Sequence, residues 1–590
     1  MLFEEASKYF EKLEEISSRL EMIDLLEQMI KNVGKDEIRA LVYFTEGVVA
    51  PAFDGIEMGI AEKLAEEAIA NATGYEKGVV AADFKKSGDL GSTAESMTSK
   101  SKLVRMVHNK FTINEVFAVF RKIARTNGSG SKDTKVKLMS ELIAASSGIE
   151  ARYVVRFALG QLRLGAGDAT LMEALSKAKT GSRDAKADIE NAYNLCSDLG
   201  HVAEVLFDGG IDAVKRFKVS IFKPIRPALA ERMPTAQEII AKMNGECSLE
   251  SKYDGIRVQV HMDKKSKRVE IFSRRQERIT EMFPDIVDAA LHEISANEVI
   301  FDGEAIAYDD NTGEYHHFQE TMQRKRKHGI EEKSVELPLH VFIFDVMYID
   351  GKDMINETYE KRRQTLENML PKEGMLRPTG RIITMDPKAF DKYFDEVVGA
   401  GLEGVIAKDI RAPYVAGARK FSWIKMKRSY KGELSDTLDL VVIGYYLGKG
   451  SRTSFNFGGL LCATYNNETD MFESVSRLGT GFSEAQMQKL EKALRAIKTK
   501  GKPARVLANI EPDFWVEPKY VVTIRADEIT RSPMHTCGST DGKDGTGYAL
   551  RFPRLVSDGI RDDKGPDDAT TTHEVISMFK DQKRIALHGE

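Results

Sequence analysis

Apolar residues recur every three or four positions from Phe3 to Ile23, with acidic residues between them. This spacing draws one apolar stripe along a helix and therefore predicts helical structure. Residues 135–146 and 150–164 repeat the pattern after the Gly- and Ser-rich loop 127–131. We expect residues 1–215 to form an all-α domain.

The apolar pattern changes after residue 245. Apolar residues alternate along the chain there, and short apolar runs stand at 299–301 and 341–344. Such runs are typical of half-buried and buried strands. Amphipathic segments at 283–294 and 359–369 lie between the strand patterns. This middle region is therefore predicted to be a mixed α/β (α+β) domain.

Strand patterns dominate beyond residue 432. Apolar runs at 440–443, 460–463 and 520–524 are separated by turns rich in Gly and Asn. Short, evenly spaced strands of this kind predict a small β-barrel of the oligonucleotide-binding (OB) type. The chain is then predicted to end in a loop and one short tail helix.

Two prolines, Pro224 and Pro227, mark the first domain boundary because proline disfavours helix and favours an extended linker. The expected domains are a helical domain at 1–215, an α/β domain at 216–428 and an OB-fold domain with its tail helix at 429–590. A length of 590 residues agrees with a multidomain chain.

The composition is that of an ordinary globular protein, with 42% hydrophobic residues, 46 Gly and 16 Pro. It excludes a largely disordered or collagen-like chain. The four cysteines have no C-x-x-C spacing, which fits a reducing compartment. We find no targeting signal and no uncharged apolar window of about 18 residues, so we expect a soluble, cytoplasmic, nucleoid-associated protein.

The net charge of −5 is concentrated at the start of the chain. Residues 1–30 hold eight acidic and three basic residues, which sum to −5, so the remainder sums to zero. Residues 411–432 carry seven Lys or Arg and no acid. Either this segment is a solvated basic face, or it recognises phosphate, for which a local basic patch is sufficient.

Several common catalytic motifs are missing. The segment 444–451 imitates a phosphate-binding P-loop, but its spacing is one residue short and Gly450 replaces the Ser or Thr that would hold magnesium. The sequence contains no H-E-x-x-H, no G-x-S-x-G and no Cys/His zinc set.

What remains is the K-x-D-G pattern at Lys252-Tyr253-Asp254-Gly255. One reading is a hairpin turn with a solvated lysine. The other is a nucleophilic lysine, which needs burial, nearby cations or a metal because a free lysine of pKa ~10.4 is almost always charged at pH 7.

The segment 252–257 resembles the nucleotidyl-lysine motif of the ATP-dependent DNA ligases. Further segments resemble the other motifs of that family and stand in the family's order: 273–277, 301–305, 344–348, 403–408, 423–427, and 551–554 with 561–564. Upstream, 88–91 and 160–165 are similar to the helical DNA-binding domain of the archaeal and eukaryotic replicative enzymes. The resemblance covers nearly the whole chain.

The resemblance implies a role for each matched residue. Lys252 would attack the α-phosphorus of ATP, and Glu304 and Glu403 would hold Mg²⁺, for which Mn²⁺ can substitute. Glu250 would contact the base and Phe344 would stack on adenine. The remaining implied contacts are basic: Arg257, Arg274 and Arg419 on ribose or phosphate, Lys425 and Lys427 on phosphate, and Arg551, Arg554 and Lys564 on the β,γ-phosphates.

The last three residues are more than a hundred positions from the pocket, so they reach it only if the barrel swings over it. We expect a hinge near Lys431-Gly432-Glu433. Arg275 stands where many members of the family have Asn, which changes the contact expected of that loop.

The implied function is the sealing of nicks in double-stranded DNA during replication, repair and recombination. We expect a monomer that binds nicked DNA, and the tail 582–587 faintly resembles a sliding-clamp peptide. An RNA ligase, an mRNA-capping-type nucleotidyltransferase and a non-catalytic nucleic-acid clamp stay open as alternatives. An NAD-dependent ligase would be expected to carry a four-cysteine zinc module, which the sequence lacks.

Overall fold

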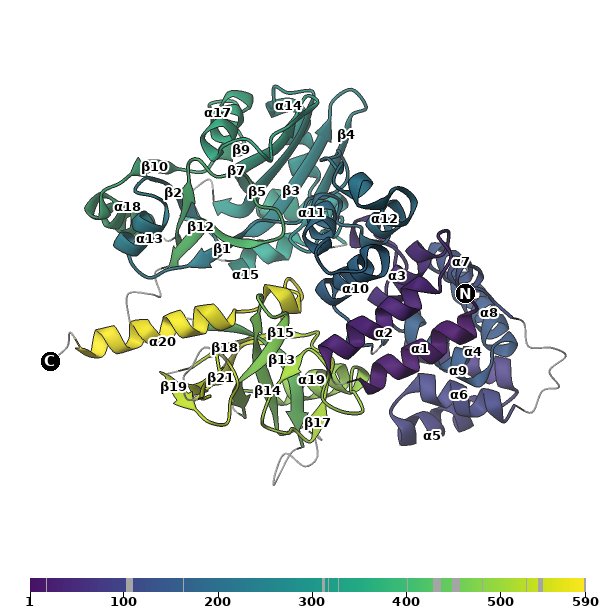
Figure 1. Cartoon of the computed structure of the whole chain (residues 1–590). Helices are drawn as coiled ribbons and strands as arrows, with labels where there is room; N and C mark the ends of the chain where they lie inside the picture. Colours follow the sequence, from purple (N-terminus) through teal and green to yellow (C-terminus); the bar gives the residue numbers. More distant parts are fainter. Residues whose placement is uncertain are drawn as a thin grey trace.

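The computed structural model describes residues 1–16, 18–101, 110–162, 164–309, 314–316, 318–326, 328–400, 402–427, 437–447, 457–479, 481–526, 528–539 and 545–587. Figure 1 shows a helical part at the right, a mixed part at the top and a strand-rich part below it. The predicted fold class is confirmed. No helix of the described residues is long and apolar enough to cross a membrane.

The N-terminal part is built from helices. The apolar stripe that starts at Phe3 is divided between two of them, because Ile16 is extended and Ser18 caps the second helix by accepting from the Glu21 N–H. The helices are α1 (Phe3–Glu15), α2 (Arg19–Lys31), α3 (Ile38–Glu46), η1 (Ala52–Asp54), α4 (Glu62–Thr73), α5 (Lys77–Ser87), α6 (Leu90–Ser99), α7 (Ile113–Arg125), α8 (Ser131–Ala145), α9 (Gly148–Ala158), α10 (Asp168–Thr180), α11 (Lys186–Cys196) and α12 (Leu199–Val214).

Phe44 is the centre of this domain's core. Its ring centroid lies 4.7 Å from that of Phe157 and 5.4 Å from those of Phe3 and Phe117. These rings come from α3, α9, α1 and α7, so one side chain joins four helices that are far apart in sequence. All four are almost fully buried.

The middle part contains two sheets. The first has the strand order β1-β12-β11-β2-β10, and the second has the order β4-β3-β5-β7-β8 with β6 and β9 at its side. Its elements are β1 (Leu229–Arg232), α13 (Ala236–Lys242), β2 (Cys247–Lys252), β3 (Ile256–Asp263), β4 (Arg268–Ser273), η2 (Thr280–Met282), α14 (Pro284–Glu293), β5 (Glu298–Asp309), β6 (Glu314–Tyr315), α15 (Phe318–Thr321), η3 (Met322–Arg324), α16 (Ile330–Glu336), β7 (Leu339–Ile349), β8 (Lys352–Asp353), α17 (Tyr359–Met369), β9 (Leu376–Pro378), β10 (Arg381–Thr384), α18 (Pro387–Gly399), β11 (Gly404–Asp409) and β12 (Arg419–Lys427).

The C-terminal part has one large sheet of order β16-β15-β14-β13-β18-β21, with β17 paired to β13, and a separate β19-β20 pair. The tail helix is longer than the short helix that the sequence predicts, and Figure 1 shows it projecting beyond the strands. The elements are β13 (Thr437–Tyr446), β14 (Gly459–Asn466), β15 (Met471–Leu478), α19 (Glu484–Ala496), β16 (Val506–Leu507), β17 (Phe514–Trp515), β18 (Val521–Arg525), β19 (Glu528–Ser532), β20 (Gly547–Arg551), β21 (Arg554–Ile560), η6 (Pro566–Asp568) and α20 (Thr572–Leu587).

The helical and strand-rich parts touch each other directly. Asp470, just before β15, accepts a hydrogen bond from Arg19 of α2 at 3.3 Å and another from the Thr170 hydroxyl of α10 at 3.2 Å. The Lys519 ammonium donates to the Gly160 carbonyl at 3.4 Å. The first and last parts of the chain therefore meet in this arrangement.

Replacing Phe44 by Ala should lower the free energy of unfolding of the helical domain by about 3–5 kcal/mol, because a buried cavity replaces a ring that four helices share. Urea denaturation followed by far-UV circular dichroism measures the loss. Leu20→Ala is the control, since Leu20 is 53% exposed and should change stability by less than about 0.5 kcal/mol. Equal losses in the two variants would contradict this view of the core.

Candidate active site

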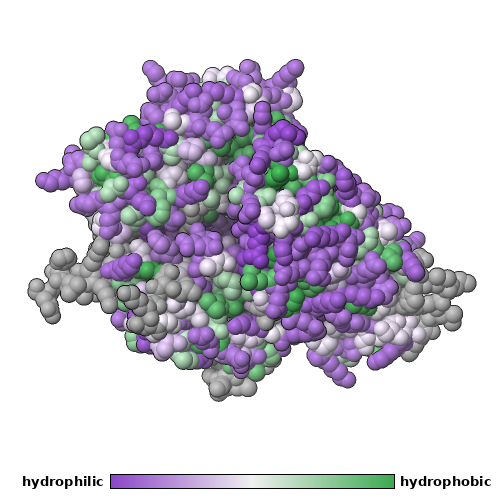
Figure 2. Space-filling view, in the orientation of Figure 1, coloured by the Kyte–Doolittle hydropathy of each residue, from purple (hydrophilic) through white to green (hydrophobic). Residues whose placement is uncertain are grey.

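A cavity of about 410 Å³ lies where the mixed part meets the strand-rich part. The mixed part supplies most of its wall, from strands of both sheets and the loops beside them, and the strand-rich part supplies Thr437, Asp439, Arg561, Asp563, Lys564 and Asp568. Figure 2 shows that hydrophilic side chains cover most of the molecular face in view. Ten of the predicted site residues line this cavity: Glu250, Lys252, Arg257, Arg274, Glu304, Phe344, Glu403, Lys425, Lys427 and Lys564.

Lys252 is the last residue of β2, and the strand order explains its neighbours. Strand β11 lies between β2 and β12, and Gly404 is in register with both Lys252 and Lys427. Glu403, one residue before Gly404, therefore stands between the two lysines and forms an ion pair with each. The Glu403 N–H also donates to the Lys252 carbonyl at 3.1 Å.

Gly404 permits this close approach of strands. Its φ is +149°, and a Cβ at this position would come within 2.2 Å of the Met426 carbonyl oxygen. Only glycine fits such a site without moving β11 away from β12.

The Glu403 carboxylate is ionised in this setting. Burial raises its pKa, but the ammonium groups of Lys252 and Lys427 outweigh burial and hold the pKa well below the usual range of a glutamate. Glu403 thus carries a negative charge between Lys252 and Lys427, at the end of the cavity where the predicted nucleophile lies.

Glu304 of β5 is the second carboxylate at this end. It accepts a hydrogen bond from the Gly255 N–H at 3.2 Å. Burial raises the pKa of Glu304 to about 7, although Lys252 and Arg257 oppose the shift. Gly255 is required here because a Cβ would come within 2.3 Å of the Ala305 carbonyl oxygen.

Two carboxylates beside a lysine fit Mg²⁺, which prefers oxygen ligands and completes its shell with water and phosphate oxygens. Among the described residues, no group of three or more His, Cys, Asp or Glu forms a closed metal cage.

Aromatic rings line the other end of the cavity. Phe344 of β7 and Trp423 of β12 make an edge contact with ring centroids 5.8 Å apart. The Arg257 guanidinium lies 5.2 Å from the Phe344 ring centroid and donates to Asp302 at 2.7 Å and to the Ala228 carbonyl at 3.0 Å. These two hydrogen bonds therefore hold the Arg257 guanidinium in place beside the Phe344 ring.

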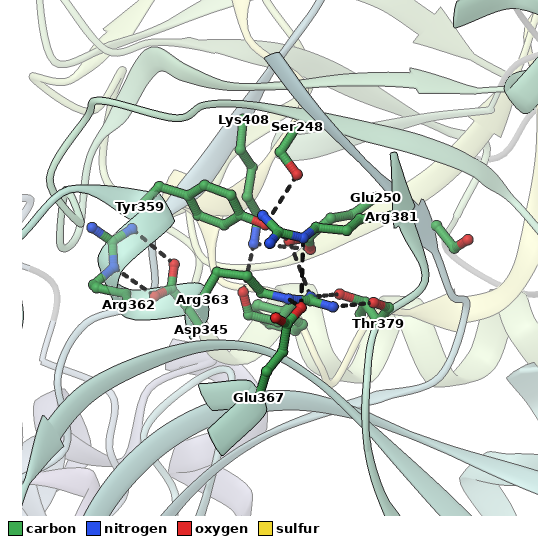
Figure 3. A network of polar contacts seen from close by, with 12 residues as sticks. Ser248, Glu250, Asp345, Tyr359, Arg362, Arg363, Glu367, Thr379, Arg381 and Lys408 are labelled. Atoms are coloured by element: carbon green, nitrogen blue, oxygen red, sulfur yellow. Dashed lines mark hydrogen bonds and ion pairs between the residues drawn. The ribbon is translucent and has the colours of Figure 1, made fainter. Parts of the chain in front are cut away.

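Glu250 of β2 is buried at this aromatic end. The Lys408 ammonium pairs with it at 3.0 Å, and the Tyr359 hydroxyl donates to it. Figure 3 shows both side chains, together with Arg363, around Glu250. We did not predict Lys408, Tyr359 or Arg363 as site residues. A lysine inside a strand whose other residues are apolar, as in Val405-Ile406-Ala407-Lys408, is the signal that points to Lys408.

Lys425 and Lys427 alternate on β12, so both face the cavity as predicted. Lys425 pairs with Glu574 of α20 at 2.7 Å. Arg419 begins β12 opposite Leu229, but its side chain lies outside the described residues. The segment 428–436, which contains the expected hinge Lys431-Gly432-Glu433, also lies outside the described residues.

The strand-rich part closes the cavity with a cluster of charges. Lys564 pairs with Asp439, and Arg561 donates to Asp563 at 2.6 Å. Arg274 donates to Asp568 at 3.1 Å across the boundary between the two parts. Arg561, which the motif contains but to which the sequence analysis assigns no role, lines the cavity with Lys564.

Arg551 and Arg554 are not at this cavity. They line another cavity of about 720 Å³ on the strand-rich part, together with Phe552 and Met534. Arg551 ends β20 and Arg554 begins β21, so both stand at the turn between these strands and away from the first cavity. Beyond this turn, the chain reaches the first cavity only at residue 561. In this arrangement the structure brings Lys564, but not these two arginines, to the predicted nucleotide site.

The upstream motif 88–91 is part of the helical core. Asp89 caps α6 and forms an ion pair with the buried Arg156 of α9. A Cβ at Gly91 would come within 2.6 Å of the Arg156 side chain, so glycine lets the two helices approach. In the second upstream motif, Arg163 lies outside the described residues.

Cations, carboxylates and aromatic rings gathered in one cavity are the features of a nucleotide-binding enzyme, in which cations meet phosphates and rings meet the base. Three family models match the chain. The model described as "DNA ligase N terminus" matches residues 2–176, "ATP dependent DNA ligase domain" matches 227–427, and "ATP dependent DNA ligase C terminal region" matches 453–564.

Curated relatives match over their full length. A "Probable DNA ligase" of Dictyoglomus turgidum is 45% identical over 587 residues, which cover 99% of this chain and 98% of the relative. The "DNA ligase" of Sulfurisphaera tokodaii is 42% identical, with 98% of each chain covered, and that of Cenarchaeum symbiosum is 38% identical, with 100% of each covered. The chain belongs to the family of ATP-dependent DNA ligases.

Asp439→Asn should lower the free energy of unfolding of the strand-rich domain by ~2 kcal/mol at pH 7. Burial raises the pKa of Asp439, but Lys564 and Arg561 outweigh burial and lower it to about 2. Because the pKa of Asp439 is lower in the folded state, its ionised carboxylate stabilises the domain at pH values above ~4, its pKa in the unfolded state. This contribution is lost as the pH falls toward 2.

The difference between wild type and variant should therefore narrow when urea unfolding at pH 7 is repeated at pH 3. Asp562→Asn is the control because Asp562 is an exposed carboxylate in the same segment. A pH-independent difference would show that the pairing with Lys564 and Arg561 does not set the effect.

Proposed function

We propose that this chain seals nicks in double-stranded DNA through an AMP group carried on Lys252. The observation that carries the proposal is the position of Lys252, which ends β2 inside the cavity. Its ammonium forms an ion pair with Glu403, and Glu403 forms a second ion pair with Lys427. Membership of the ATP-dependent DNA ligase family supports ATP as the AMP donor and nicked DNA as the substrate.

The first step forms a bond between Lys252 and AMP. The Lys252 ammonium loses a proton to solvent, and its Nζ attacks the α-phosphorus of ATP. A nitrogen–phosphorus bond forms, the bond from the α-phosphorus to the bridging oxygen breaks, and pyrophosphate leaves with that electron pair. The nitrogen then loses a second proton to solvent and becomes the uncharged nitrogen of a phosphoramidate. Lys425, Lys427 and Lys564 line the same cavity and oppose the negative charge of the phosphates.

Two further transfers return the enzyme to its starting state. A 5′-phosphate oxygen of the nick attacks the AMP phosphorus and makes an adenylated DNA end. The bond from that phosphorus to Lys252 breaks, and the lysine nitrogen leaves with the electron pair and takes protons from solvent to become the ammonium again. The 3′-hydroxyl then loses its proton to solvent and attacks the 5′-phosphorus, and AMP leaves. Both transfers depend mainly on positioning and charge neutralisation.

The aromatic end of the cavity suits the base. We assign the base contact to Glu250 and the stacking contact to Phe344, with Arg257, Arg274 and Arg419 on ribose or phosphate oxygens. Support comes from the cavity that Glu250, Phe344, Arg257 and Arg274 share with Lys252.

Glu304 and Glu403 would hold Mg²⁺, for which Mn²⁺ can substitute. When bound, the ion would neutralise charge on the transferring phosphoryl group and favour the neutral amine of Lys252. Both carboxylates line the cavity that contains Lys252, which supports the assignment.

DNA binding requires the strand-rich domain to move. In the arrangement of Figure 1 this domain closes the cavity, and Arg274 and Arg275 hold it at Asp568 and at the Asp562 carbonyl. A nick reaches Lys252 only after these contacts break. Arg551 and Arg554 would contact the β,γ-phosphates only in a further rotation, about the predicted hinge at 431–433.

Sealing would serve replication, repair and recombination, with contacts mainly to the DNA backbone, so it should be nearly independent of sequence. We also propose that the three domains span residues 1–215, 216–428 and 429–590 and that the protein is a monomer. A sliding clamp would be a second partner of the protein and would bind the tail 582–587. The side chains of that tail lie outside the described residues. RNA ligation and mRNA capping are not favoured, because full-length relatives are named DNA ligases.

Lys252→Ala should abolish the AMP adduct and the sealing of an ordinary nick, because no other group supplies the nucleophile. Intact-mass spectrometry after incubation with ATP and Mg²⁺ measures the adduct. The same variant should still seal a nick that already carries AMP, since that transfer does not use the lysine. Lys265→Ala, at an exposed lysine of the same domain, is the control. An adduct of undiminished amount in Lys252→Ala would refute the assignment.

Locking the strand-rich domain over the cavity should block nick sealing, because a duplex reaches Lys252 only when this domain moves away. The pair Arg275→Cys and Asp562→Cys can be joined by a cleavable thiol cross-linker, because the Arg275 side chain reaches the Asp562 carbonyl at 2.9 Å. The chain's own four cysteines are buried and should not compete.

Cleaving the linker should restore sealing, which gel electrophoresis of a nicked, labelled duplex measures. Each single-cysteine variant treated with the same reagent is the control. Full sealing by the cross-linked protein would contradict the need for domain opening.

A further inference from the structure

Glu250 is held by a buried polar network that none of the contacts assigned above explains. One carboxylate oxygen pairs with Lys408 of β11 at 3.0 Å, and the other accepts from the Tyr359 hydroxyl and lies 3.6 Å from Arg363. All four side chains are almost fully buried. Glu250 therefore has partners on both oxygens and has little freedom to rotate.

Two of these partners come from α17, which packs against β7. Tyr359 opens this helix, and Arg363 follows one turn later, so both point to the same side. Their positions are 109 and 113 residues after Glu250, and neither belongs to a motif that the sequence analysis recognises. Arg362 of the same helix turns to Asp345 of β7 at 2.6 Å and anchors the helix there.

Arg363 joins Glu250 to Thr379, a residue that lies beside β2 and also lines the cavity. Its guanidinium donates to the Thr379 hydroxyl at 2.8 Å, to the Thr379 carbonyl at 2.6 Å and to Glu367 at 2.7 Å. Thr379 lines the cavity, and its N–H donates to the carbonyl of Ile343, the residue before Phe344. Figure 3 shows Arg363 between Glu250 and Thr379.

We infer that Tyr359 and Arg363 of α17 are positioning residues that select the nucleotide base, by fixing the Glu250 carboxylate as a hydrogen-bond acceptor. The inference rests on the proposed contact between Glu250 and the base. The exocyclic amine of adenine donates to such a carboxylate, whereas guanine presents an oxygen at that position and is repelled. The selectivity for ATP over GTP then depends on how firmly α17 holds Glu250.

The test uses the full-length protein and the variant Tyr359→Phe, which removes only the hydroxyl. The ATP concentration for half-maximal adduct formation should rise about tenfold, as expected for the loss of one hydrogen bond to a charged group. The maximal rate should change by less than about twofold, and the preference for ATP over GTP should fall by about tenfold. At saturating DNA, the maximal rate of sealing a pre-adenylated nick without ATP should also change by less than about twofold, because the variant acts on binding of the base.

Tyr348→Phe is the matched control. Its hydroxyl donates to the Glu298 carboxylate at 2.9 Å, in the same domain, and Tyr348 does not line the cavity. It should alter neither the ATP requirement nor the nucleotide preference. Arg363→Lys keeps a cation but not the fork that reaches Thr379, so it should lie between wild type and Arg363→Met in both measurements.

A double variant separates positioning from general support of the fold. In a Glu250→Gln background, Tyr359→Phe should add no further change in nucleotide preference, because its effect passes through the carboxylate. Additive effects would overturn the inference, as would an unchanged ATP requirement or a parallel loss of adduct formation and of pre-adenylated sealing. If the wild type forms no AMP adduct, the proposed function itself fails, and the inference with it.

Discussion

The row of alternating charges formed by Lys252, Glu403 and Lys427 is the interaction on which the rest of the site depends. It exists because β11 lies between β2 and β12 with Gly404 in register with both lysines. Two cations alone would repel each other at this spacing, and a lone buried carboxylate would take up a proton. Together the three charges stabilise one another and keep a lysine inside a cavity.

The same kind of pairing joins the parts of the chain. The ion pair between Arg274 and Asp568 links the mixed and strand-rich domains. The ion pair between Arg19 and Asp470 links the helical and strand-rich domains. Charged contacts of this kind separate at lower cost than an apolar interface of equal size, because water solvates the released groups. They suit domains that must close around a nucleotide and open for a duplex.

Much of this site can be predicted from sequence, for reasons that lie in short-range structure. Lys252 and Gly255 are close in the chain, and Lys425 and Lys427 alternate on one strand, so motif and strand period together bring them to one cavity. The partners of Glu250 are different. Tyr359 and its neighbours on α17 meet Glu250 only because a helix packs behind the sheet, and no local pattern encodes that contact.

Other limits of prediction have equally physical causes. The stripe from Phe3 to Ile23 is continuous in sequence but crosses a helix break, and Leu20, which belongs to it, is exposed after the cap at Ser18 begins a second helix. Arg551 and Arg554 share a motif with Lys564, but the strand between them separates the two cavities. Sequence order alone does not reveal which end of a motif faces a pocket.

Attaching AMP to Lys252 would also change the electric field of the site. The ammonium group that now balances Glu403 would become an uncharged nitrogen bearing an anionic phosphoryl group, so only Lys427 would remain to offset the carboxylate. The site would then attract the departing pyrophosphate less strongly than it attracted ATP, which favours release of that product. The charge row would be restored when the lysine is freed, so the positive charge beside Glu403 would fall and return once in each turnover.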